Sequence, residues 1–237
     1  MVIHNKYQLL KYNPAINQLD INLENIIHAS GYNNRNEFPF VSLLNELYFE
    51  VKNIISPECA FIVVPQAVSS LPKGEIAVDG IILKTGKIIS SAFKEISKSV
   101  LFVGTVGKDF DNWLEDKKKE NDLLGEYLAN LIGSEIAESL AKWIHKKIFE
   151  YFGDEELRCS NRYSPGYCGW DVNEQKKIFE FFPKDVCGIT LTESALMLPM
   201  KSISGIVGIG KNIEWKDYPC EVCNVSFCYK NRRSILV

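Results

Sequence analysis

The chain has 237 residues, of which 46% are hydrophobic and 24% are charged, a composition typical of a folded globular protein. Its net charge of −3 provides no basic surplus for binding phosphates, which argues against nucleic acid as a partner. No apolar run approaches the ~20 residues of a membrane span, and no signal-peptide pattern opens the sequence, so we expect a cytoplasmic protein with no membrane partner.

The first half of the chain predicts short strands between helices. Apolar residues at helical spacing indicate a helix over residues 39–55, which Pro57 ends. Asp79 and Gly80 indicate a tight turn within residues 76–83. The other elements expected here are a short strand and one helical turn within residues 1–37, strands at 59–64 and 100–106, and a helix at 86–96.

Residues 121–152 are the longest periodic segment and predict one helix with a continuous apolar face. Gly125 and Gly133 weaken this helix slightly but permit close packing. Glu135 and Glu138 lie beside the apolar face, where a solvated helix charge is the simplest interpretation of each.

Residues 162–167 read Arg-Tyr-Ser-Pro-Gly-Tyr and predict an extended loop with unpaired backbone groups. Pro165 fixes its own φ, and Gly166 permits a positive φ and a close approach of a ligand to the backbone. Arg162 has the fork of donors that suits a carboxylate, and it could equally pair with a nearby Asp or Glu. Taken alone, such a loop is more often structural than a ligand clamp.

The last third predicts a further helix and two strands. Asp171 and Glu174 suggest a capping box for a helix that ends before Pro183. Strands are expected at 186–191 and 202–209, around a turn at 192–194. Because no linker divides the chain, we expect a single α+β domain over residues 1–237 with a mainly antiparallel sheet, an N-terminal arm at 1–37 and a cysteine-rich tail at 212–237.

Three of the seven cysteines lie close together near the end of the chain. Cys220, Cys223 and Cys228 have the spacing with which a backbone turn can aim thiolates at one ion. A fourth ligand would come from Cys187, Cys168, a water molecule or a group of a partner. A structural zinc ion, an iron–sulfur cluster, a redox pair and free thiols are all compatible with this pattern.

Two blocks of the last third resemble one known family. Residues 162–167 are similar to the S-adenosylmethionine-binding loop of the reactivation domain of cobalamin-dependent methionine synthase. The second block matches a Leu-Thr-Glu-Ser, Met, Pro and Ser-x-Ser-Gly pattern of that family at Leu191, Thr192, Glu193, Ser194, Met197, Pro199, Ser202, Ser204 and Gly205. A weaker match is Ala137 and Glu138 with His145, where the family has an acidic residue facing the ligand.

The resemblance implies a C-shaped α+β domain with a twisted antiparallel sheet flanked by helices. It would bind S-adenosylmethionine in a shallow groove beside the loop. Arg162 would hold the carboxylate of the ligand, and Glu138 would meet its cationic side. Backbone contacts to the adenine would come from Ser164, Gly166 and Tyr167.

The implied function is support of the reductive methylation that restores inactive cobalamin. The cobalamin would belong to a separate methionine synthase or another corrinoid methyltransferase, and a donor such as flavodoxin or ferredoxin would supply the electron. We therefore expect a stand-alone reactivation protein that needs no general base or nucleophile of its own. Two alternatives are a partner-binding module of the same fold with a zinc or iron–sulfur tail, and a methyltransferase that uses S-adenosylmethionine on another acceptor.

Overall fold

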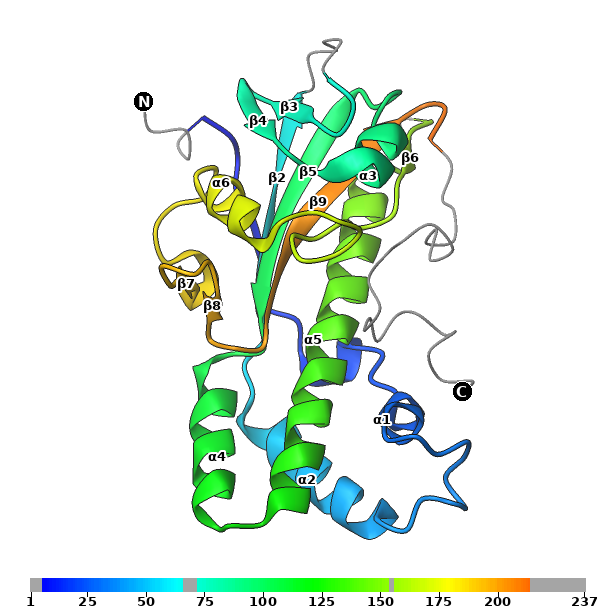
Figure 1. Ribbon diagram of the computed structural model, residues 1–237, viewed down its shortest axis with the longest axis vertical. Coiled ribbons are helices and arrows are strands. Elements are labelled where there is room, and N and C mark those ends of the chain that lie inside the picture. Colours follow the sequence, from blue (N-terminus) through cyan, green and yellow to red (C-terminus); the bar gives the residue numbers. More distant parts are fainter. Residues whose placement is uncertain (1–5, 66–71, 154–155, 214–237) are drawn as a thin grey trace.

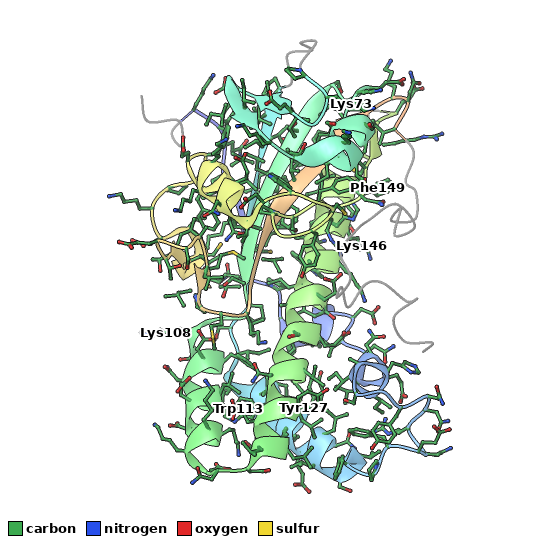
Figure 2. All side chains as sticks on the ribbon, viewed as in Figure 1. Lys73, Lys108, Trp113, Tyr127, Lys146 and Phe149 are labelled. Atoms are coloured by element: carbon green, nitrogen blue, oxygen red, sulfur yellow. The ribbon has the colours of Figure 1, made fainter. Side chains whose placement is uncertain are left out.

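The structure is a computed structural model that describes residues 6–65, 72–153 and 156–213. Figure 1 shows a sheet region and a region of helices, with the long helix α5 (Leu123–Tyr151) extending along both. Figure 2 places Tyr127 of α5 in the helical region and Lys146 beside the sheet region. With 29 residues and a rise of about 1.5 Å per residue, α5 is long enough to pack against both regions.

A five-stranded sheet forms the centre of the fold. The strand order is β1 (Leu10–Tyr12), β2 (Glu58–Pro65), β5 (Lys98–Thr105), β9 (Ser202–Gly210) and β6 (Arg158–Cys159), and every neighbouring pair is antiparallel. The predicted α+β fold with a mainly antiparallel sheet is thus confirmed. The segment expected as an N-terminal arm contributes β1 to this sheet and α1 (Leu23–Ala29) to the helical region.

Apolar residues on both faces of the sheet are buried. Phe61, Phe102 and Val207 face the core that includes α5, whereas Ile62 and Leu101 face the opposite core. That second core is covered by α3 (Gly86–Ala92), α6 (Gln175–Phe179) and the hairpin of β3 (Ile76–Val78) and β4 (Ile81–Leu83). Asp79 and Gly80 both have positive φ angles, which confirms the predicted tight turn.

The helical region packs α1, α2 (Val41–Ile54) and α4 (Lys108–Lys119) against α5. The close packing predicted at Gly133 is present, because a Cβ there would lie 2.7 Å from Cε1 of Phe110 on α4. Glu135 is not the solvated charge that we expected. The residue is 8% exposed, and its carboxylate accepts hydrogen bonds from the backbone of Asn22 (3.1 Å) and the side chain of Asn25 (3.0 Å).

One helix was not predicted, and two local predictions differ from the structure. The sequence did not reveal α4, because only Phe110 and Leu114 of its twelve residues are buried and the apolar period is therefore weak. The strand expected at 186–191 is instead a 3-10 turn, η4 (Val186–Gly188), followed by the short β7 (Thr190–Leu191). A positive φ of 52° at Cys187 explains this break, since strands require a negative φ.

The capping box expected from Asp171 and Glu174 also does not form. Asp171 accepts a hydrogen bond from the backbone of Asn173 (2.8 Å) and caps the 3-10 turn η3 (Val172–Glu174) before α6. The carboxylate of Glu174 instead accepts a hydrogen bond from the backbone of Lys84 (2.8 Å). Glu174 thereby links the start of α6 to the chain just after β4.

Gly205 in β9 has no room for a side chain. A Cβ atom there would lie 2.7 Å from Cζ of Phe102 and closer still to the carbonyl oxygen of Tyr163. We expect Gly205→Ala to lower the free energy of unfolding by about 2 kcal/mol through overpacking. For a chain of this length, that loss corresponds to a fall in melting temperature of roughly 4–8 °C, measurable by calorimetry.

Gly153→Ala is the matched control, because a Cβ there would lie 3.4 Å from the nearest atom, the carbonyl oxygen of Glu150. We expect it to change the free energy of unfolding by less than about 0.5 kcal/mol. Equal melting temperatures for Gly205→Ala and the wild type would contradict the close approach of Tyr163 to β9.

Candidate functional site

The candidate site begins at the outer edge of the sheet, where the chain after β6 continues along β9. Cys159 pairs with Ile209 and the backbone of Ser160 donates to Gly208 (2.8 Å), whereas Tyr163 pairs with Ile206. Residues 160–163 therefore oppose only residues 206–208, which places one extra residue on the outer segment. Such a β-bulge bends a strand and redirects its side chains. Arg162 lies in this bulge.

The guanidinium of Arg162 pairs with the carboxylate of Glu138 on α5, with 2.7 Å between Nη2 and Oε1. The two side chains are 12% and 22% exposed, so this pair is better shielded from water than an ordinary surface ion pair. Arg162 therefore does pair with a nearby acid, one of the two possibilities that the sequence allowed. Its partner is the residue expected at the cationic side of the ligand, so the two predicted charges lie together.

The rest of the loop is closed by its own backbone hydrogen bonds. Gly166 donates to the carbonyl of Trp170 (2.7 Å), and Tyr167 donates to the carbonyl of Ser164 (3.2 Å). Gly166 has the positive φ that was expected, 92°. The expectation of unpaired backbone groups is therefore wrong for the amides of Gly166 and Tyr167, because the chain folds back on itself. Tyr167, five residues after Arg162 in the sequence, is 38% exposed.

His145 fixes the bulge from the side of α5. It lies two helical turns after Glu138, and its Nε2 is 3.0 Å from the carbonyl oxygen of Ser160. Because a carbonyl only accepts, Nε2 carries the proton in this contact. Burial and the positive charge of Arg162 lower the pKa of His145 to about 4, so the imidazole is neutral at pH 7. Two residues of α5 thus hold the bulge: His145 contacts Ser160 at its start, and Glu138 pairs with Arg162 within it.

The second sequence block forms a hairpin that is linked to β9. Strands β7 and β8 (Met197–Leu198) pair, and the hydroxyl of Thr192 accepts from the backbone of Leu196 (3.0 Å). Gln175 on α6 connects this turn to β9, since its amide nitrogen donates to Ala195 (2.7 Å) and its amide oxygen accepts from Ser204 (2.9 Å). Sequence analysis missed Gln175, because nothing in a helix pattern marks a buried amide that joins two distant segments.

The comparisons with known proteins identify the family and support the fold of the chain. The sequence profile described as "Vitamin B12 dependent methionine synthase, activation domain" matches residues 91–219, which is more than half of the chain. The chain belongs to this activation-domain family. The matched range contains Glu138, His145, the loop at 162–167 and the second block, so both blocks that carried the resemblance lie within it.

A solved structure supports the activation-domain fold over a longer range. The crystal structure of the MetH reactivation domain bound to AdoHcy has a TM-score of 0.63 with 14% sequence identity, covering 92% of this chain and 82% of that one. At this identity the likeness concerns the fold. No curated protein matches the chain. None of the helices in the described ranges of this activation domain is long and apolar enough to cross a membrane.

The cysteines proposed as metal ligands are only partly covered by the structure. Cys220, Cys223 and Cys228 lie outside the described residues. Cys187 is buried, which raises the pKa of its thiol to about 11, and Cys168 is half-buried. Within residues 6–65, 72–153 and 156–213, no three metal-ligating side chains come together.

The depressed pKa of His145 predicts a pH-dependent stability. An unfolded histidine takes up a proton near pH 6.5, whereas the folded site resists it down to about pH 4. The contribution of the neutral His145 to the free energy of unfolding is therefore fully present above pH 6.5. It is lost as the pH falls towards 4, by about 3 kcal/mol in total. We expect His145→Gln, which keeps a donor towards Ser160 but cannot titrate, to lose less stability than the wild type between pH 7 and pH 4.5 in urea unfolding experiments.

The exposed His28 on α1 offers the matched control, as His28→Gln leaves His145 in place and should retain the wild-type loss of stability. Parallel stability curves for His145→Gln and the wild type would show that His145 does not remain neutral in the folded protein.

Proposed function

We propose that this activation-domain protein binds S-adenosylmethionine beside the Arg162/Glu138 pair and presents its methyl group to a cobalamin held by a partner. The observation that carries the proposal is the ion pair itself, 2.7 Å long and presented by a bulge at the edge of the sheet. It lies within the range matched by the activation-domain family. The AdoHcy in the related crystal structure belongs to the same chemical class of ligand.

The charges of the pair are complementary to the amino-acid end of S-adenosylmethionine. That end carries one carboxylate and one ammonium group, which match the guanidinium of Arg162 and the carboxylate of Glu138. A ligand that binds here exchanges one ion pair for two, so neither side chain is left without a counter-charge. This matters because an unpaired charge in a shielded position is costly. Each charge-assisted hydrogen bond to the ligand contributes about 1.5–3 kcal/mol.

The loop after Arg162 supplies the surface for the adenine. Its shape is set before the ligand arrives, because Gly166 and Tyr167 are already held by hydrogen bonds within the loop. The amide of Gly166 is occupied, so contacts from this loop to the adenine amino group would use carbonyl oxygens, which keep a second lone pair. Ser164, Gly166 and Tyr167 are the residues that we assign to this contact. A preorganised loop lowers the entropy that binding costs.

The reaction that follows needs little chemistry from this chain. The partner's cobalamin, once reduced by a one-electron donor such as flavodoxin or ferredoxin, would supply the electron pair that takes the methyl group. The sulfonium sulfur would keep the electron pair of the broken bond and become the thioether of AdoHcy. We propose that the cobalamin module is a methionine synthase or another corrinoid methyltransferase, acting as a partner of the described fold. The role of Arg162, Glu138 and the loop is to position the methyl donor.

Titration calorimetry with S-adenosylmethionine and AdoHcy tests the proposal. We expect the wild type to bind both ligands, and Arg162→Ala to weaken binding by roughly 10- to 100-fold, the loss of one charge-assisted contact. Arg158→Ala is the matched control, because Arg158 is exposed on the same edge segment and should leave the affinity unchanged. Melting temperatures of the variants separate loss of binding from loss of folding.

The double variant Arg162→Ala, Glu138→Gln removes the carboxylate that Arg162→Ala leaves unpaired, so it can be tested if the single variant unfolds. A wild-type protein that binds neither ligand would overturn the proposal and would favour a module that only docks a partner. Mixing the protein with a cobalamin-binding methyltransferase, reductant and methyl-labelled S-adenosylmethionine then tests whether the label reaches cobalamin.

A further inference from the structure

Lys201 is a half-buried ammonium group that the ion pair described above does not use. It directly precedes β9, and its carbonyl accepts a hydrogen bond from the backbone of Val106 at the end of β5 (2.9 Å). Its Nζ donates to the hydroxyl of Ser134 on α5 (3.1 Å). Among the residues that the structure describes, no carboxylate forms an ion pair with Lys201, so a neutral hydroxyl is its side-chain partner.

The environment of Lys201 disfavours its charge. Burial lowers the pKa of the Lys201 ammonium, and the negative charge of Asp111 on α4 offsets only part of this effect. One oxygen of Asp111 accepts from the backbone of Met200 (2.8 Å), while its other oxygen, Oδ1, is buried and has no hydrogen-bond partner among the described residues. A shielded ammonium with spare donor hydrogens gains more from an incoming anion than a solvated one does.

Lys201 approaches the same face of α5 as Arg162. Ser134, the partner of Lys201, and Glu138, the partner of Arg162, are four residues apart on this helix. Residues at this spacing are neighbours on one helix face, with about 5–6 Å between their Cβ atoms. Ser134 is exposed and Glu138 is half-buried, so a ligand has access to the face between them. Two cations therefore contact successive turns of α5, Lys201 at Ser134 and Arg162 at Glu138.

We infer that Lys201 is a ligand-binding residue that shares the carboxylate of the S-adenosyl ligand with Arg162. The inference rests on the proposed function and adds a second cation to its site. When Glu138 turns to the ammonium group of the ligand, Arg162 and Lys201 together hold the carboxylate. The carboxylate would give Lys201 an ion-pair partner, which no carboxylate among the described residues provides. The alternative is that Lys201 only ties the start of β9 to α5 through Ser134.

Two ligands separate these roles by titration calorimetry: AdoHcy and its decarboxylated analogue, which has the ammonium and the adenosine but no carboxylate. We expect Lys201→Met to weaken the binding of AdoHcy about tenfold, the loss of one charge-assisted contact, and to leave the decarboxylated analogue within about twofold of the wild type. Lys201→Arg, which retains a cation, should recover most of the AdoHcy affinity. A purely structural lysine would not produce this dependence on the carboxylate.

A control variant completes the design. Lys108→Met removes an exposed lysine at the start of α4, which Figure 2 places near the junction of the two regions, and should change neither affinity. If Lys201→Met fails to fold, Lys201→Met with Asp111→Asn removes the opposing charge as well and is tested in its place.

The outcomes distinguish this inference from the proposed function. If the wild type binds AdoHcy and Lys201→Met binds it equally well, or weakens both ligands by the same factor, the role of Lys201 is overturned while the proposed function stands. If the wild type does not bind AdoHcy, the proposed function itself fails. A tenfold loss that is confined to the carboxylate-bearing ligand, with recovery in Lys201→Arg, supports the second cation.

Discussion

The structure depends on the burial of α5 against one face of the antiparallel sheet. Its residues Leu140, Ile144 and Ile148 are fully buried in the core that includes Phe61 and Phe102 of the strands. The helix continues beyond the sheet, where Ile132 and Leu128 serve the packing of α1, α2 and α4. Helix α5 therefore fixes the helical region relative to the sheet. The side chains on the face of α5 that lies outside the core are thereby held at fixed positions along the sheet.

The candidate site uses that remaining face. Ser134, Glu138 and His145 recur along α5, and each meets a group from the edge of the sheet: Lys201, Arg162 and the carbonyl of Ser160. The edge segment comes this close to β9 because Gly205 leaves room for the carbonyl of Tyr163. The bulge then turns Arg162 towards the helix, where a regular strand would alternate its side chains between the two faces. The bulge in the edge segment and the spacing of residues along α5 thus together bring Arg162 to Glu138.

The electrostatic state of the site follows from partial burial. Arg162 and Glu138 neutralise one another in a shielded position. Burial, and to a smaller extent the charge of Arg162, lowers the pKa of His145 and keeps it neutral at pH 7. An ion pair of this kind is weak support for stability, because desolvation offsets much of the attraction. It is well suited to a zwitterionic ligand, which can replace each partner without leaving a bare charge. The second sequence block has a different role, since its hydroxyl groups are engaged in the hairpin and in the bond to Gln175.

The sequence by itself determined the fold class, the long helix, the tight turn at Asp79 and Gly80, and the family, because periodicity, turn residues and short motifs are local properties. It also indicated Arg162 and Glu138, through the resemblance rather than through their spacing. The tertiary structure decided that these two residues pair with each other and that Glu135 is buried beneath Asn22 and Asn25. It alone placed Gln175 and Lys201, whose contacts join segments 20 or more residues apart. The physical reason is that a charge acquires its partner, its burial and its pKa only when distant parts of the chain pack together.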